Sequence, residues 1–138
     1  MKLTRRDTLM LGLGTAVAAM IPMQASAAVD EAIAAFTGGA EMGSEGITLI
    51  APEIAENGNT VPIEVDAPDA EAILILAAGN PTPGVAEMRF GPLAAAQSGS
   101  TRIRLAGTQD VIAIAKMPDG TFVRASQEVK VTIGGCGG

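Results

Sequence analysis

The ten residues VKVTIGGCGG occupy positions 129–138 and join two kinds of backbone. Val129, Val131 and Ile133 alternate with polar residues, which is the two-residue period of a half-buried β-strand. The glycines that follow have no Cβ and adopt both signs of φ, so they do not extend the strand. This stretch predicts a final strand that leads directly into a glycine-rich arm over residues 134–138.

The arm contains the only cysteine of the 138-residue chain. It consists of Cys136 and the glycines on its two sides, Gly134, Gly135, Gly137 and Gly138. Chain ends are poorly ordered unless contacts hold them, so we expect a flexible arm that contributes nothing to folding. Three extended residues beyond Ile133 span about 10 Å, enough for the thiol to enter a pocket on another protein. This geometry favours a carrier whose cargo is attached to Cys136.

Other roles for the cysteine fit less well. Most free cysteines are small buried hydrophobes, but four glycines and a chain end supply no core around Cys136. The prenylation signal places its cysteine fourth from the end, before aliphatic residues, and that pattern is not found here. A disulfide between two copies of the chain stays open as an alternative.

The rest of the chain lacks the side chains of most catalytic sites. It has no histidine, which excludes a cysteine–histidine catalytic pair and a cysteine–histidine metal site. Its carboxylates are scattered, as on a solvated surface. We therefore expect a scaffold that is not an enzyme, with no catalytic residue, no metal and no cofactor of its own.

Residues 1–27 have the composition of an export signal. Three basic residues in the first six positions precede thirteen apolar or small ones, too few to span a bilayer easily. The ASA at 25–27 fits a cleavage site. The TRRDTLM at 4–10 resembles a twin-arginine signal, although Thr8 stands where an aromatic residue is common. We expect export to the periplasm and cleavage after position 27; an uncleaved anchor helix is the alternative.

The remaining residues, 28–138, are acidic. They include six basic and fourteen acidic residues, a formal charge of −8. That charge argues against binding nucleic acid or anionic membrane surfaces. The three phenylalanines are the only aromatic residues of the chain, which also argues against stacking on bases.

Between the signal and the arm, the sequence predicts two regions. Residues 28–46 are expected to form a short helix and a link, with Asp30 as the cap and Gly38 near the end of the helix. Ile33 and Phe36 are three positions apart and are expected to pack on the body. A β-sandwich is expected to follow over 47–133.

The sandwich is predicted from repeated short apolar patterns. Strands are expected at 47–49, 61–67, 73–78, 86–90, 102–105, 111–117, Phe122 and 129–133, with turns at 56–59 and 117–120, a rigid loop at 79–84 and a second loop at 91–100. The segment 73–78 is apolar throughout, which indicates a central strand buried on both faces. Pro62 should begin its strand or lie on an edge, because proline lacks an N–H. Seven or eight such strands predict an antiparallel two-sheet β-sandwich.

The sequence resembles the SoxY family, the sulfur carriers of bacterial thiosulfate oxidation. The likeness covers residues 28–138 and is most specific in five segments. These are AFTGG at 35–39, PEIAENGN at 52–59, GNP at 79–81, STRIRLA at 100–106 and VKVTIGGCGG at 129–138.

The resemblance implies an immunoglobulin-like sandwich that pairs with the β-sandwich protein SoxZ. It implies that Cys136 is the covalent attachment site and that the chemistry belongs to partners. A haem c enzyme would couple thiosulfate to the thiol as cysteine S-thiosulfonate, and a manganese hydrolase would release sulfate. A molybdenum–haem dehydrogenase is a further possible partner.

Two rival functions come from other classes of protein. A ubiquitin-like sulfur carrier also ends in two glycines, but it activates its terminal carboxylate in the cytoplasm and has a crossover helix. A periplasmic structural module that dimerises through Cys136 is the other.

Overall fold

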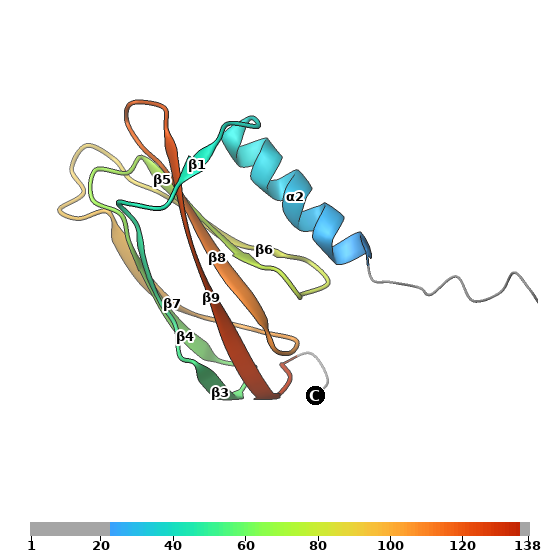
Figure 1. Ribbon diagram of the computed structural model, residues 1–138. Helices are drawn as coiled ribbons and strands as arrows, with labels where there is room; N and C mark the ends of the chain where they lie inside the picture. The colour runs from blue at the N-terminus through green and yellow to red at the C-terminus, as the bar shows by residue number, and fades with distance from the viewer. Residues whose placement is uncertain (1–22, 136–138) are drawn as a thin grey trace, which may run out of the picture.

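The computed structural model describes residues 23–135 and contains one helix followed by nine strands (Figure 1). The helix is α2 (Met23–Thr37). The strands are β1 (Met42–Gly43), β2 (Thr48–Ile50), β3 (Ile54–Asn57), β4 (Val61–Asp66), β5 (Ala72–Ala77), β6 (Gly84–Arg89), β7 (Ser98–Ile103), β8 (Gln109–Lys116) and β9 (Phe122–Ile133). The basic and apolar parts of the expected export signal lie outside the described residues.

The strands form two sheets. The larger has the order β1-β9-β8-β5-β6, and the smaller has the order β2-β4-β7. β9 is twelve residues long and pairs with two further strands, both parallel to it. β1 pairs with the beginning of β9, and β3 pairs with its end. The remaining pairings are antiparallel. The two sheets pack face to face, which confirms the predicted β-sandwich.

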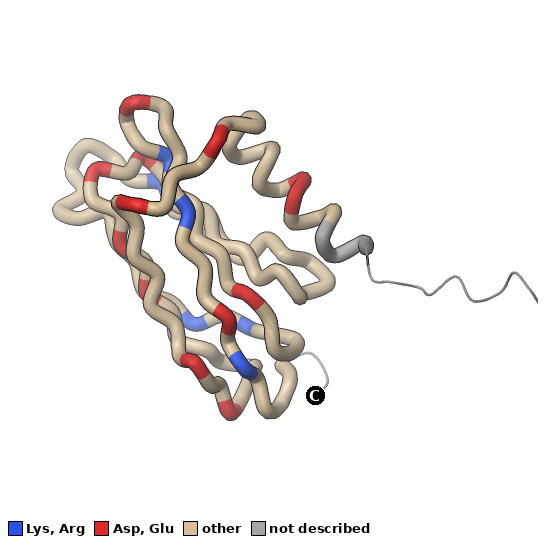
Figure 2. Tube along the Cα trace, viewed as in Figure 1, with Lys and Arg blue, Asp and Glu red and all other residues tan. Residues whose placement is uncertain are grey.

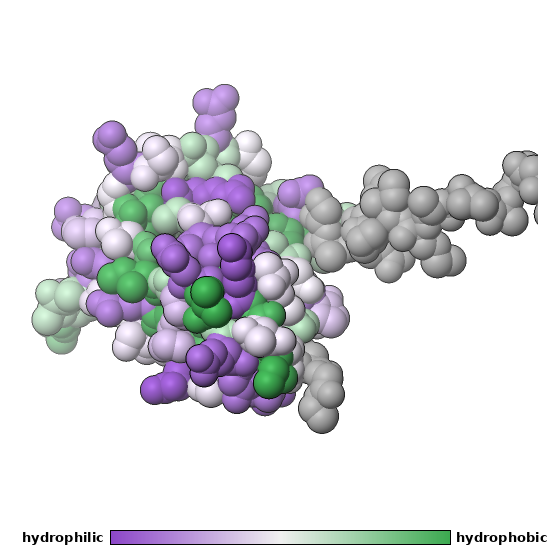
Figure 3. Space-filling view, turned by 60° about the horizontal axis from the view of Figure 1, so that its bottom comes forward, coloured by the Kyte–Doolittle hydropathy of each residue, from purple (hydrophilic) through white to green (hydrophobic). Residues whose placement is uncertain are grey.

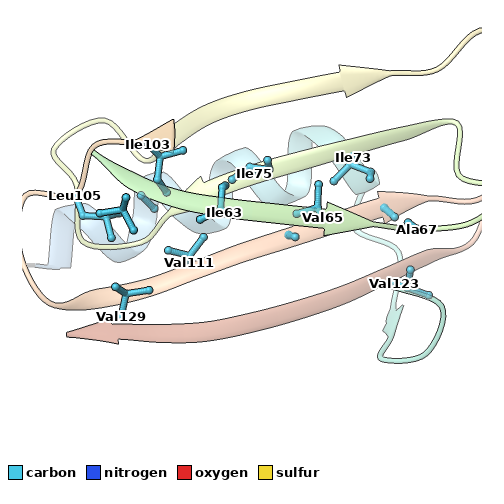
Figure 4. Packing of buried hydrophobic residues seen from close by; sticks show 14 of the residues in the cluster. Ile63, Val65, Ala67, Ile73, Ile75, Ile103, Leu105, Val111, Val123 and Val129 are labelled. Atoms are coloured by element: carbon cyan, nitrogen blue, oxygen red, sulfur yellow. The ribbon is translucent and has the colours of Figure 1, made fainter. Parts of the chain in front are cut away.

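The core between the sheets is aliphatic (Figure 4). On β4 the odd-numbered residues Val61, Ile63 and Val65 are buried and the residues between them are exposed, as the alternation predicts. They pack in one cluster with residues of the larger sheet such as Ile73 and Val111. Burial of such side chains is the main favourable term for this domain, worth about 1.5–3 kcal/mol for each.

The outer face of the larger sheet is covered by α2. Leu76, Ile112 and Ile114 point away from the sandwich core and form a second buried cluster with Phe122 and the helix. The Phe36 and Phe122 rings meet edge to face, with centroids 5.7 Å apart. The helix therefore explains why β5 and β8 are apolar on both faces, and the predicted central strand at 73–78 is confirmed.

The helix begins earlier than the sequence predicts. It starts at Met23, so Asp30 lies inside it and does not cap it. The predicted end is confirmed, because the Gly38 N–H donates to the Ala34 oxygen at 2.8 Å and Gly38 has a φ of 66°. Ile33 and Phe36 pack on the sheet as expected. Cleavage after position 27 would leave residues 28–37 of α2, including these contacts.

Several strand boundaries also differ from the predictions. The short strands β1 and β3 carry no alternating apolar pattern and were not expected, and the expected loop at 91–100 ends where β7 begins at Ser98. The return strand at Phe122 and the strand at 129–133 are one strand, β9. β4 is the central strand of its sheet, with β7 along its full length. On its other side β2 pairs only with residues 64–66, so Pro62, which lacks an N–H, has no neighbouring strand there, as at a sheet edge.

The tight turns follow their local chemistry. Asn57 accepts the Asn59 N–H through its side chain at 3.0 Å, and the Gly120 N–H donates to the Met117 oxygen at 3.0 Å with φ of 84° at Gly120. Both turns were predicted. Along residues 23–135, no helix combines the length and the apolar character that a membrane span needs.

Candidate functional site: the base of the cysteine arm

The expected attachment site lies at the end of β9. Cys136, Gly137 and Gly138 fall outside the described residues, whereas Gly134 and Gly135 are described. β9 ends beside β3, at the end of the sandwich away from the β8–β9 hairpin (Figure 1). The residue before the cysteine is therefore presented at one end of the molecule.

Backbone hydrogen bonds hold the start of the arm against the body. The Gly135 N–H donates to the Leu105 oxygen at 2.8 Å. The Leu105 N–H donates to the Gly58 oxygen at 2.7 Å, and the Gly58 N–H donates to the Ile133 oxygen at 2.8 Å. These three bonds link the β3–β4 turn, the β7–β8 loop and the end of β9. We call Gly58, Gly134, Gly135, Leu105 and Ala106 the glycine clasp.

The clasp leaves no room for side chains on its glycines. A Cβ on Gly58 would lie 2.4 Å from the Leu105 oxygen and 2.9 Å from the Gly135 nitrogen. A Cβ on Gly134 would lie 2.3 Å from the Ala106 oxygen, and one on Gly135 would lie 2.6 Å from the Gly58 oxygen. All of these obstacles are backbone atoms, which do not move aside as a flexible side chain does. Glycine is needed here for close approach of three backbone segments.

The structure corrects the expectation that all five arm residues stand free of the body. Gly135 is buried, and Gly134 is half-buried. The sequence indicates flexibility because glycines near a chain end usually lack contacts, but here Leu105 and Gly58 supply backbone partners. Gly134 and Gly135 therefore belong to the folded body.

Asn80 supports the clasp from behind. Its side-chain nitrogen donates to the Arg104 oxygen at 2.8 Å, and its side-chain oxygen accepts the Ala106 N–H at 2.9 Å. That oxygen also accepts the Gln109 side-chain N–H at 2.9 Å, and Gln109 is 8% exposed. The half-buried Asn80 and the buried Gln109 thus form an amide network that fixes the backbone on both sides of Leu105, whose oxygen accepts the Gly135 N–H.

Four of the five segments that carry the resemblance meet at this place. Gly58 comes from 52–59, Asn80 from 79–81, Leu105 from 100–106 and Gly135 from 129–138. Sequence reasoning did not place these segments together or identify Gly58 and Asn80 as site residues. The signal that could have done so is that these segments carry the same family resemblance as the cysteine motif.

The surface around the clasp carries interleaved charges of both signs (Figure 2). The two ion pairs found among residues 23–135 are Arg89 with Glu87 and Lys116 with Glu71, and neither includes Arg104. Arg104 packs its stem against the clasp, because a Cβ on Gly135 would lie 2.7 Å from its Cγ. Seen with this end forward, apolar side chains lie singly among polar ones (Figure 3). The exposed isoleucines here are Ile54 and Ile133, at 62% and 65%.

Within the part of the chain that the structure describes, no group of three or more histidine, cysteine or carboxylate residues is arranged to hold a metal ion. The described residues thus define a β-sandwich scaffold that holds Gly135, the residue before the single cysteine of the chain, at one end.

Comparison with known proteins gives the family. The family model described as "Sulfur oxidation protein SoxY" matches residues 33–136. The sulfur carrier protein SoxY from Chlorobium limicola f thiosulfatophilum is 38% identical, with a TM-score of 0.68, and the match covers 78% of this chain and 99% of that chain. The chain belongs to the SoxY family of sulfur oxidation proteins. A search of curated proteins gives no match.

More distant solved structures resemble the chain in fold alone. The superoxide reductase (neelaredoxin) from Ignicoccus hospitalis is 18% identical, with a TM-score of 0.56, covering 64% of this chain and 81% of that chain. A putative superoxide reductase from Thermotoga maritima, also 18% identical, has a TM-score of 0.53 and covers 66% of this chain and 87% of that chain. The ubiquitin-like alternative is not supported, because residues 42–133 contain no helix.

Proposed function

We propose that the chain is a periplasmic carrier that holds sulfur-oxidation intermediates covalently on the Cys136 sulfur. Membership of the SoxY family supports a carrier role in sulfur oxidation. The observation that carries the covalent part is the clasp: it fixes Gly135, the residue before the cysteine, at one end of a scaffold. The chain would not catalyse the steps and would need no cofactor of its own.

The loading step is an oxidative coupling. The Cys136 thiol loses a proton, its sulfur forms an S–S bond with the outer sulfur of thiosulfate, and two electrons leave to a haem c enzyme. The product is Cys–S–S–SO3⁻. A manganese hydrolase then adds water across the S–SO3⁻ bond, which releases hydrogensulfate and leaves the persulfide Cys–S–SH. A molybdenum–haem dehydrogenase would oxidise that outer sulfur to a sulfonate, taking oxygen from three waters and removing six electrons, before a second hydrolysis restores the thiol.

Pairing with SoxZ is a separate part of the proposal. The outer face of the β2-β4-β7 sheet has a groove of about 610 Å³ lined by residues that include Ile50, Pro62 and Thr101. Ile50 is 57% exposed, so a partner sheet that covers it would remove apolar surface from water. Ile50→Glu should weaken capture by SoxZ, whereas Leu93→Glu, at an equally apolar but 97% exposed loop position, should not.

The decisive measurement is the intact mass of the chain after incubation with thiosulfate, the haem c enzyme and an electron acceptor. The wild-type chain should gain the mass of one thiosulfate group less the proton lost from the thiol, and a reductant should remove it. Cys136→Ser should gain nothing. A chain that appears only as a disulfide dimer, with no thiosulfate adduct under the same conditions, would support the dimerising module instead.

Export is tested separately, by N-terminal sequencing of chain isolated from the periplasm. A start at Ala28 agrees with the proposed signal, and a start at Met1 favours an anchored precursor.

A further inference from the structure

The first glycines of the arm are tied to residues far away in the sequence, which changes how the thiol is presented. If the arm started at Ile133, the cysteine would lie three residues from the body, about 10 Å when extended. The clasp instead fixes Gly135, so one residue, about 3.5 Å, separates Cys136 from a fixed backbone position.

We infer that Gly58 is a positioning residue for Cys136, and that the glycine clasp makes this end of the sandwich a contact surface for every enzyme that takes the thiol. The inference rests on the proposed carrier function. Gly58 is buried and contacts Gly135 directly, since the Gly135 nitrogen would lie 2.9 Å from a Cβ at position 58. The absence of a side chain at Gly58 is what lets Gly135 reach the Leu105 oxygen.

The short reach defines the contact surface. An enzyme that receives a sulfur held one residue from the body must approach the segments that surround the clasp. These are the β3–β4 turn with the exposed residues Asn57 and Asn59, and the β7–β8 loop with the exposed Thr108. Thr108 is itself tied to β9, because its hydroxyl accepts the Val131 N–H at 3.0 Å. The exposed residues of these two segments are polar and would be recognised through hydrogen bonds, while the exposed Ile54 and Ile133 at the same end offer apolar contact.

The chain contains a matched control for Gly58. Gly107 lies in the same β7–β8 loop, beside the clasp, but a Cβ there would meet no atom within 4 Å. Gly58→Ala therefore inserts a methyl group into the clasp, and Gly107→Ala adds the same group to open space. Asn80→Ala is a milder alternative, because it removes the side chain that braces Arg104 and Ala106 without adding atoms.

The test uses the full chain and needs no sulfur chemistry. Amide hydrogen exchange of Gly135 in the wild type should be at least about tenfold slower than that of Gly137, since the Gly135 N–H is bonded and buried. Gly58→Ala should remove most of that difference, and Gly107→Ala should keep it. If Gly58→Ala does not fold, the same exchange measurement is made on Asn80→Ala, which should reduce the difference between the Gly135 and Gly137 exchange rates without removing it.

A second readout distinguishes positioning from stability alone. Cys136 is alkylated with a small and a bulky maleimide, under conditions in which circular dichroism shows every variant folded. In the wild type the bulky reagent should be slower by several-fold, because the body crowds a thiol held one residue away. Gly58→Ala should bring the two rates together, and Gly107→Ala should not.

Two results would overturn the inference. One is a wild-type Gly135 amide that exchanges as fast as Gly137. The other is a folded Gly58→Ala or Asn80→Ala chain with the wild-type ratio of alkylation rates. Failure of thiosulfate loading alone would instead count against the carrier function, since neither readout depends on it.

Discussion

Two Gly-Gly pairs, at 38–39 and 134–135, are identical in sequence and differ in the reason for their glycines. Gly38 and Gly39 have φ of 66° and 84°, and a Cβ on either would meet no atom within 4 Å. Gly134 and Gly135 have no such φ, but a Cβ on either would strike backbone atoms at 2.3 and 2.6 Å. The first pair supplies a conformation that ends a helix, and the second supplies space.

The difference teaches that a glycine pair has no fixed meaning by itself. A helix end needs a left-handed backbone, which is a local property of the chain. A close approach of backbones depends on what lies opposite, and here that is Leu105 and Gly58. Substitutions that add the same atoms should therefore have different effects at the two pairs.

The largest expected effect is that of Gly135→Val. The side chain would collide with the Gly58 backbone, and the Gly135 N–H would lose the Leu105 oxygen, so we expect a loss of about 2 kcal/mol or more. For a domain of this size the Tm should fall by roughly 10 °C. Thermal unfolding followed by circular dichroism measures this change.

Gly107→Val is the control for that experiment and should leave the Tm nearly unchanged. A Gly135→Val chain that melts like the wild type would show that the clasp contributes nothing to stability and that these glycines behave as a free tail.

Gly39→Ala should have a smaller effect, of about 1 kcal/mol, because alanine must adopt a left-handed backbone there while its methyl group meets nothing. Denaturant titration measures it. Asparagine tolerates this conformation, so Gly39→Asn should lose less than Gly39→Ala. Equal losses in the two variants would indicate that the cost is steric and that the two glycine pairs do not differ as described.

A still smaller effect is expected at the β8–β9 hairpin, the end of the molecule away from the clasp. Asp119 accepts the Thr121 hydroxyl and N–H, and these bonds hold the pKa of Asp119 below its ordinary value of 3.8. A lowered pKa stabilises the folded state above pH 3.8, and this contribution is lost as the pH falls through the folded pKa. Thr121→Val should lower the Tm slightly at pH 7 and not at pH 2. If the Tm difference between Thr121→Val and the wild type persisted at pH 2, the Thr121 hydroxyl would stabilise the hairpin by some interaction that does not need the ionised Asp119 carboxylate.

Cys136→Ser should have the smallest effect on stability, within about 0.5 kcal/mol, since no core is expected around the cysteine. Equal denaturant midpoints, combined with complete loss of thiosulfate loading, would separate the thiol from the clasp beside it. A loss of more than 1 kcal/mol would show that the thiol is packed and that the fixed part of the chain extends beyond Gly135.

Features with a short-range cause were predicted well. The alternation on β4 and the continuous apolar run of β5 identify these strands, and the turns at 56–59 and 117–120 follow from their own residues. Errors came where a partner element decides the outcome. β1 and β3 are strands because β9 offers them an edge, and their own sequences carry no alternation.

The sequence by itself determined that the chain is a β-sandwich of the SoxY type, with one cysteine at position 136 and no histidine. These properties depend on composition and on neighbouring residues. Only the tertiary structure decided that Gly134 and Gly135 belong to the body and that Gly58 and Asn80 surround the base of the arm. The reason is physical: close packing and hydrogen bonding between backbones depend on segments brought together by folding, and a glycine looks the same in the sequence whether it supplies a turn or a space.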